Sequence, residues 1–132
     1  MVGIVVVGHG RLGEEAMATL ESVIGSAEAV EAVATSAAER PEVMRRRIVE
    51  AVGRVRRDGG VLIMTDMLGD TQTNQALAVA RELGAEVVAG VNMPMLVKAT
   101  TARGDCEARG LAELLAQYGR EHIVWATARA GR

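Results

Sequence analysis

The sequence predicts an α/β fold in which a mostly parallel, doubly wound sheet is flanked by helices. Short runs of β-branched residues alternate with segments whose apolar residues have helical spacing. The segments are joined by short connections, which favours right-handed crossovers between parallel strands. Because 132 residues can bury one hydrophobic core but not two, we expect a single domain over residues 1–132.

The first expected strand spans 3–8, where an unbroken apolar run is typical of a strand that is buried on both faces. The helix that follows, 12–24, has its apolar residues on one stripe, and Gly25 can end it. Residues 103–107 are expected to form an exposed, mobile loop. The other elements are expected from the same signals: a strand at 29–35, a helix at 39–57, a strand at 61–65, a helix at 75–83, a strand at 86–91, a helix opened by Pro94, a helix around 111–118 and a last strand at 122–127.

Composition argues against several classes of function. The formal net charge is −2, so no surplus of basic residues indicates a nucleic-acid partner. Tyr118 and Trp125 are the only aromatic residues, which argues against a site that stacks bases, sugars or flavins on protein rings. Cys106 is the only cysteine, so no disulfide can form within the chain. The apolar run at the N-terminus is too short for a signal peptide or a membrane span, and we expect a cytoplasmic protein with no direct membrane insertion.

Polar loops are expected at one edge of the sheet. In a doubly wound sheet, ligands bind beyond the carboxyl ends of the strands, at the point where the strand order reverses. The loops after the first, third and fourth strands, at 8–11, 66–74 and 92–94, all contain conspicuous polar residues. Such loops can bring His9, Asp66 and the backbone of Thr71 to one place.

His9 is the candidate nucleophile. It directly follows an apolar strand, and the glycines on both sides of it leave room for a bulky group or a partner protein. A neutral imidazole has a lone pair on one nitrogen when another group holds the proton on the other, and Asp66 is the candidate for that role. A helix beginning near Thr71 would add unpaired N–H groups and the positive end of its dipole. These parts suit phosphoryl transfer, which needs mainly positioning and charge neutralisation.

Simpler interpretations of the same residues are also open. A histidine at a strand end can be an ordinary surface residue, and Asp66, Asp70 and Thr71 can be turn or N-cap residues. The loop GHG has neither the dinucleotide glycine pattern nor a Walker lysine, so we expect no nucleotide cofactor. Cys106 has no histidine or cysteine cluster around it, so we expect no metal site.

Three segments of the sequence carry a resemblance to a known family. The first strand ends in VVVGHG, the third strand and its loop read LIMTDMLGDTQTN, and AGVNMPML spans Ala89 to Leu96. In this order, and in a chain of this length, the segments resemble the IIA components of the mannose family of bacterial sugar phosphotransferase systems. The resemblance extends from Val2 to about Trp125.

The resemblance implies a role for each site residue. His9 matches the phosphorylated histidine of the family, and Asp66 matches the carboxylate that hydrogen-bonds it. Thr71 stands where the family has a serine whose hydroxyl and backbone help to hold the phosphoryl group. The expected phosphate-binding residues are Gly10, Gly69, Asp70 and Thr71.

The resemblance also implies partners. Phospho-HPr would donate the phosphoryl group from its phosphohistidine, and a histidine of a IIB component would accept it. Family members are commonly homodimers in which the last strand crosses to the sheet of the partner. Residues 122–127 would be that strand, and they would cover a sheet edge that otherwise invites pairing.

The loop after the third strand departs from the family pattern. Sugar-transporting members often have Asp, two residues, then Gly-Gly-Ser-Pro, an aromatic residue and Asn, whereas Asp70, Gln72 and Thr73 replace the second Gly, the Pro and the aromatic residue here. The carboxylate of Asp70 would repel an incoming phosphoryl group at a cost of about 1 kcal/mol at surface dielectric. The other two replacements are expected to alter a surface that a partner reads.

We therefore expect a phosphotransferase that works as a phosphocarrier, with a phosphohistidine intermediate at His9, between phospho-HPr and a IIB component in sugar phosphotransfer. The alternative is a regulatory module of the same fold, whose phosphorylation state controls the binding of another protein. A third interpretation is the phosphotransfer subunit of a dihydroxyacetone kinase, which typically has Ser after the histidine and a Gly-Ser-Ala loop; neither is present here. Plain small-ligand binding has no phosphate loop or aromatic platform to support it.

Overall fold

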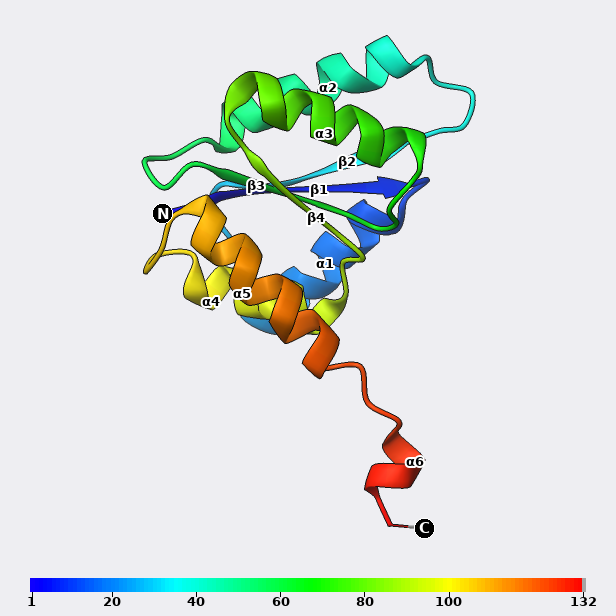
Figure 1. The fold of residues 1–132 in the computed structure, drawn as a ribbon, viewed down its shortest axis with the longest axis vertical. Coiled ribbons are helices and arrows are strands. Elements are labelled where there is room, and N and C mark those ends of the chain that lie inside the picture. Colours follow the sequence, from blue (N-terminus) through cyan, green and yellow to red (C-terminus); the bar gives the residue numbers. More distant parts are fainter. Residues whose placement is uncertain (132) are drawn as a thin grey trace.

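Within residues 1–131, which the computed structural model describes, four parallel strands form one sheet with the order β2-β1-β3-β4 (Figure 1). The chain runs from β1 outward to β2 and then crosses to β3 on the other side of β1, so the strand order reverses between β1 and β3. The predicted α/β class with a parallel, doubly wound sheet is confirmed. The strands are β1 (Gly3–His9), β2 (Val30–Thr35), β3 (Val61–Thr65) and β4 (Glu86–Ala89).

Helices cover both faces of the sheet (Figure 1). No described helix is both long enough and apolar enough to cross a membrane. On one face lie α2 (Pro41–Val55) and α3 (Thr71–Leu83); on the other lie α1 (Leu12–Ile24), α4 (Met93–Ala102) and α5 (Ala108–Glu121), and α6 (Ala126–Arg129) is a single turn beyond the body of the domain.

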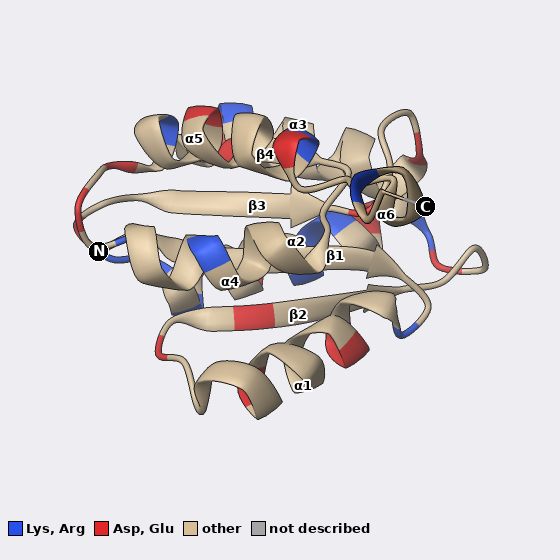
Figure 2. Cartoon of the chain, turned by 90° about the horizontal axis from the view of Figure 1, so that it is seen from below, with Lys and Arg blue, Asp and Glu red and all other residues tan. Residues whose placement is uncertain are grey.

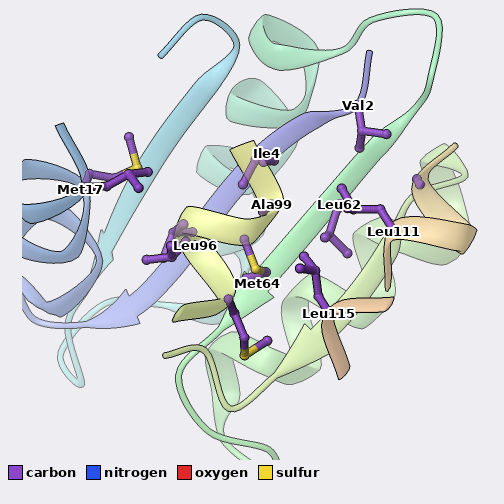
Figure 3. Close-up of a cluster of buried hydrophobic side chains, with 13 residues drawn as sticks. Val2, Ile4, Met17, Leu62, Met64, Leu96, Ala99, Leu111 and Leu115 are labelled. Atoms are coloured by element: carbon purple, nitrogen blue, oxygen red, sulfur yellow. The ribbon is translucent and has the colours of Figure 1, made fainter. Parts of the chain in front are cut away.

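The unbroken apolar run of β1 reflects burial on both faces. Ile4 and Val6 point into a core cluster with α1, α4 and α5, whereas Val5 and Val7 point into a second cluster with α2 and α3. Burying each such side chain contributes about 1.5–3 kcal/mol, so β1 is a rigid support for the histidine at its end. Figure 3 shows residues that pack with Ile4 in the first cluster: Met17, Leu62, Met64, Leu96, Leu111 and Leu115.

Charged residues are kept away from the centre of the sheet. β1 and β3 contain no Lys, Arg, Asp or Glu, and these residues lie on the helices, the loops and the edge strands (Figure 2). On edge strand β2, Glu31 accepts a hydrogen bond from Arg54 of α2 at 2.9 Å. Because the central strands carry no charge, the polar groups at their carboxyl ends stand apart from the rest of the sheet.

The segment 122–127, expected to be a strand that crosses to the sheet of a second copy, forms no strand within the single chain. Residues 123–125 pair with no strand in the described part of the chain, and α6 begins at Ala126. The segment leaves the body of the domain after α5, so it reaches no sheet edge of its own chain (Figure 1). A strand is stable only when its backbone groups find partners on a neighbouring strand.

Other boundaries differ in smaller ways. The prediction of an exposed loop at 103–107 is wrong at Arg103, because this residue is buried. Its carbonyl accepts the N–H of Val2 at 3.0 Å. β4 ends at Ala89 because the next two residues both donate their N–H groups to the carbonyl of Thr65. α3 begins at Thr71, which confirms the helix start expected near that residue and lengthens the helix expected at 75–83, since Asp70 adopts the extended conformation of an N-cap.

Candidate functional site

The candidate site lies at the carboxyl ends of β1 and β3, where the strand order reverses. His9 is the last residue of β1, and Asp66 directly follows β3. The two strands pair in parallel with Val7 opposite Thr65, so both ends reach the same edge of the sheet. The polar loops predicted after the first and third strands are therefore brought together at the position where doubly wound sheets bind ligands.

Asp66 holds the imidazole of His9 in one orientation. Its Oδ2 atom accepts the backbone N–H of His9 at 2.8 Å and also lies 2.8 Å from Nδ1 of that residue. Nδ1 therefore carries a proton that it donates to Asp66, and the lone pair of the neutral ring lies on Nε2. The side chain of Asp66 is 11% exposed and that of His9 is 51% exposed. A largely buried carboxylate thus presents an accessible imidazole.

Asp70 lies at the other nitrogen of the ring. It is the N-cap of α3, but its side chain makes no capping hydrogen bond to that helix. Its Oδ2 atom lies instead 3.0 Å from Nε2 of His9. The imidazole consequently has a carboxylate oxygen at each of its two nitrogens.

Gln72 connects the two carboxylates. It lies in the first turn of α3 and is only 2% exposed. Its Nε2 atom donates to Oδ1 of Asp66 at 3.0 Å and to Oδ2 of Asp70 at 3.3 Å. The same amide nitrogen lies against the imidazole of His9, 2.6 Å from Nδ1 and 3.0 Å from Nε2. Both amide N–H groups are thus shared among the acceptors that surround the ring.

The carboxylates favour the protonated form of the ring. The hydrogen bond to Asp66 raises the pKa of His9 above its ordinary value of 6.5; burial opposes this shift, and the charges of Asp66 and Asp70 add to it. Burial would raise the pKa of Asp66, but hydrogen bonds from the His9 backbone, the Gln72 amide and the His9 ring outweigh it, and the pKa of Asp66 is lowered. The resting site is therefore an ionised Asp66 beside a ring that gains a second proton readily.

Buried hydrogen bonds hold the loop between β3 and α3. Thr73 is fully buried, and its hydroxyl donates to the carbonyl of Met67 at 2.6 Å and lies 2.9 Å from Oγ1 of Thr65. Gly69 has a φ of +95°, which residues other than glycine rarely adopt, and this lets the chain turn back into α3. The expectation that Gln72 and Thr73 alter a partner-reading surface is wrong, because both side chains point inward.

The four residues expected to bind phosphate differ in their surroundings. Thr71 is exposed at the first position of α3, and the N–H groups of residues 71–73 donate to no acceptor in the described part of the chain. Gly69 is exposed at the turn before the helix. Gly10 donates its N–H to the carbonyl of Thr35 at 2.8 Å, so in this conformation that N–H is not available to a phosphoryl group. Asp70 has a negatively charged carboxylate, which repels an anion.

A cleft of about 310 Å³ adjoins His9 on the side of α2 and α3. Within it, Glu39 accepts a hydrogen bond from Arg47 at 2.7 Å, so these two charges neutralise each other. Its lining includes His9, Thr35, Ser36, Glu39, Thr71 and Gln72. The cleft leaves space beside the imidazole for a group that approaches from outside.

The third predicted loop, at 92–94, has a structural role. Oδ1 of Asn92 accepts the N–H of Met95 at 3.0 Å and so caps α4, and its Nδ2 donates to the carbonyl of Gly119 at 3.2 Å. Both side-chain groups of Asn92 are therefore used to join α4 to α5. The loop contributes no contact to His9 among the hydrogen bonds of the described residues.

A metal ion is the other group that this arrangement could hold. His9, Asp66 and Asp70 each place one ligand atom within 4.8 Å of the others. Hydrogen bonds from Gln72 and from the ring already engage these carboxylates, and no buried oxygen of the two aspartates lacks a partner within the described residues. Within the described residues, hydrogen bonds thus engage the side chains that could bind a metal ion.

Gln72 is the site residue that the sequence reasoning missed. It was treated as a replacement on a surface, but Gln72, Ala76 and Val79 follow helical spacing on the buried face of α3. A polar side chain on an otherwise apolar stripe signals a buried hydrogen-bonding role.

Comparisons with known proteins agree on one family. The family model described as PTS system fructose IIA component matches residues 3–117. The chain is 31% identical over 125 residues to the PTS system mannose-specific EIIAB component of Escherichia coli K12, an alignment that covers 92% of this chain and 38% of that protein. The chain thus spans well under half the length of the curated relatives that it matches.

Solved structures give the same result for the fold. The phosphotransferase system component EIIA from Streptococcus agalactiae superposes with a TM-score of 0.88 at 25% identity, covering 97% of this chain and 99% of that one. The mannose/sorbose specific IIA subunit from Enterococcus faecalis superposes with a TM-score of 0.82 at 22% identity, covering 93% of this chain and 92% of that one. The second likeness is one of fold.

Proposed function

The chain belongs to the mannose family of IIA components of the phosphotransferase system, and we propose that it works there as a phosphocarrier. In this proposal His9 accepts a phosphoryl group from phospho-HPr in the cytoplasm and passes it to a IIB component in sugar phosphotransfer. The observation that carries the proposal is the hydrogen bond from Nδ1 of His9 to Asp66 at 2.8 Å, because it leaves Nε2 as the nucleophile.

The chemical step is an exchange between two imidazoles. The lone pair on Nε2 of His9 attacks the phosphorus, a new N–P bond forms, and the N–P bond of the donor breaks with its electron pair returning to the donor ring. Asp66 keeps the proton on Nδ1 and stabilises the positive charge that the phosphorylated ring carries. In the transfer to the acceptor, the acceptor imidazole attacks the phosphorus, and the N–P bond at His9 breaks with its electron pair returning to Nε2.

The first turn of α3 is the proposed binding site for the phosphoryl oxygens. Its N–H groups at residues 71–73 have no acceptor in the described chain, and the positive end of the helix dipole adds to their attraction for an anion. The hydroxyl of Thr71 is a further donor at the same position. Gly10 and Gly69 would act by leaving space and by allowing the turn.

The test is incubation with radiolabelled phospho-HPr followed by mapping of the label. We expect acid-labile, base-stable phosphate on His9 and none in His9→Ala. The matched control is His122→Ala, which removes the other histidine of the chain and should leave labelling unchanged. Failure of the wild-type chain to accept phosphate from phospho-HPr would contradict the proposal.

A regulatory role is a second candidate, and one observation favours it. Asp70 lies at the nitrogen that must attack, which suits a protein that is phosphorylated slowly. Adding a purified IIB component to the labelled protein separates the two roles. Rapid loss of label to IIB supports the carrier, whereas stable label together with phosphorylation-dependent binding of another protein supports the regulator.

We also propose that the protein is a homodimer in which the segment after α5 contacts the second copy. Ile123 and Trp125 are 77% and 79% exposed, which is unusual for such large apolar side chains. β4 pairs only with β3 among the described strands, and an apolar hollow beside β4 includes Val87, Val88 and Ala116 in its lining. Light scattering should give the mass of two chains for the wild type and of one chain for Ile123→Ser/Trp125→Ser. Equal masses would contradict this proposal.

A further inference from the structure

The imidazole of His9 is held by a carboxylate on both sides. Oδ2 of Asp66 lies 2.8 Å from Nδ1, and Oδ2 of Asp70 lies 3.0 Å from Nε2. The first contact serves phosphoryl transfer, because it orients the ring. The second contact opposes it, because it engages the nitrogen that has to attack the phosphorus.

We propose that Asp70 is a built-in competitor of the phosphoryl group, held at Nε2 of His9 by Gln72, and that it must leave before His9 is phosphorylated. This inference rests on the proposed phosphocarrier function. It assigns Asp70 a regulatory contact with the reacting atom and makes Gln72 a positioning residue. It also replaces the expectation that Asp70 helps to bind phosphate.

Direct competition follows from the short distance between the two groups. An oxygen of Asp70 that lies 3.0 Å from Nε2 occupies space that an incoming phosphoryl group needs, and its negative charge repels that group. Before attack, the Nε2 proton has to pass to the carboxylate or to water, and Asp70 has to move aside. The contact therefore slows phosphorylation in two ways, since the carboxylate favours the protonated ring and occupies space beside the attacking nitrogen.

Gln72 keeps Asp70 at this position. Its amide N–H groups donate to Oδ1 of Asp66 and Oδ2 of Asp70, and the side chain is 2% exposed in the first turn of α3. A phosphoryl oxygen that displaced Asp70 would meet the same amide. Gln72 can thus donate to the carboxylate in the resting state and to the phosphoryl group afterwards.

Other charges near the ring do not supply this contact. Glu39, which lines the adjoining cleft from the side of α2, is paired with Arg47 at 2.7 Å. Arg11, which follows β1, lies 3.2 Å from Glu15 of α1. Asp66 and Asp70 are therefore the charged groups of the described residues that act on His9 directly.

The test compares the wild type with Asp70→Asn. Asparagine is as good an N-cap as aspartate, so α3 should be retained, and circular dichroism checks this. Loss of one carboxylate should lower the midpoint of the His9 ring titration in NMR, raise the rate of labelling by phospho-HPr roughly tenfold near neutral pH, and lengthen the lifetime of the phosphoprotein because a repelling charge is gone. Gln72→Leu should also raise the labelling rate but shorten the lifetime, since the amide is then lost to the phosphoryl group.

The outcomes separate this inference from the proposed function. If Asp70→Asn changes neither the titration midpoint of His9 nor the labelling rate, Asp70 does not compete with the phosphoryl group. The proposed phosphocarrier function would not be affected by this result. If no variant is labelled by phospho-HPr, the proposed function fails, and the NMR titration together with labelling by phosphoramidate, a protein-free donor, still tests Asp70. A wild-type rate that rises to the level of Asp70→Asn on addition of EDTA would show that a metal ion blocks Nε2, and would overturn the inference.

Discussion

The side chains at the carboxyl end of the sheet have partners within the chain, whereas the large apolar side chains of the segment after α5 are exposed. Around His9, three polar side chains from the loop after β3 and from α3 find partners within the same chain. The segment after α5 instead leaves Ile123 and Trp125 exposed. The difference teaches that the proposed chemistry draws on side chains of one chain, whereas the exposed segment is the part that the proposed homodimer would cover. Substitutions in one region should therefore leave the property of the other unchanged.

The largest expected effect is at Asp66. Asp66→Asn should lower the initial rate of labelling by phospho-HPr by about 100-fold or more, because an amide can present N–H to Nδ1 and favour the wrong tautomer. Light scattering should give the same mass as for the wild type. A normal rate would show that Asp66 does not orient the ring, and a changed mass would show that the two regions are coupled.

The next effect concerns stability at the base of the site. Thr73→Val removes a buried hydroxyl that bonds the carbonyl of Met67 at 2.6 Å, and it should lower the free energy of unfolding in urea by about 1–3 kcal/mol. The matched control is Thr71→Val at the exposed first position of α3, which should change the free energy by less than about 0.5 kcal/mol. Equal effects at the two positions would mean that the loop is not held by its buried hydroxyl.

A smaller effect is the pH dependence of stability. The pKa of His9 is raised in the folded protein, so the stabilisation by its carboxylates is complete below its ordinary value of 6.5 and is lost as pH rises through the raised value. The excess of the melting temperature of the wild type over that of His9→Gln should thus shrink between about pH 6 and pH 9. For Asp66, whose pKa is lowered, stabilisation is present above 3.8 and is lost as pH falls through the lowered value. A difference that grows between pH 6 and pH 9 would contradict the pairing at His9.

The smallest expected effect is that of a substitution in the exposed segment on the rate of phosphorylation. Trp125→Ala should change the rate of labelling by phospho-HPr by less than about twofold, because Trp125 is 79% exposed and its ring N–H donates to Thr127, away from His9. Initial rates at equal protein concentration provide the measurement. A large loss of rate would mean that the second copy completes the site, and would remove the contrast between the two regions.

Local patterns were sufficient to predict much of the fold and the contact between His9 and Asp66. The unbroken apolar run before His9 predicts a strand with both faces buried, and Ile4 and Val5 do face opposite core clusters. The order of strands and helices predicts a parallel, doubly wound sheet, whose carboxyl edge then becomes the place to look for His9 and Asp66. These inferences succeed because periodicity and connection length are properties of short segments.

Positions set by contacts between distant segments required the folded chain. Gln72 and Thr73 were expected on a surface, but α3 begins at Thr71 and turns both side chains inward. Asp70 was expected among the phosphate-binding residues, yet the approach of α3 to the end of β1 brings it to 3.0 Å from Nε2 of His9. Residues 123–125 form no strand within their own chain because strand pairing depends on a neighbouring edge, which they do not meet there. Hydrogen bonds and strand pairs join residues far apart in sequence, so their formation depends on how whole elements pack.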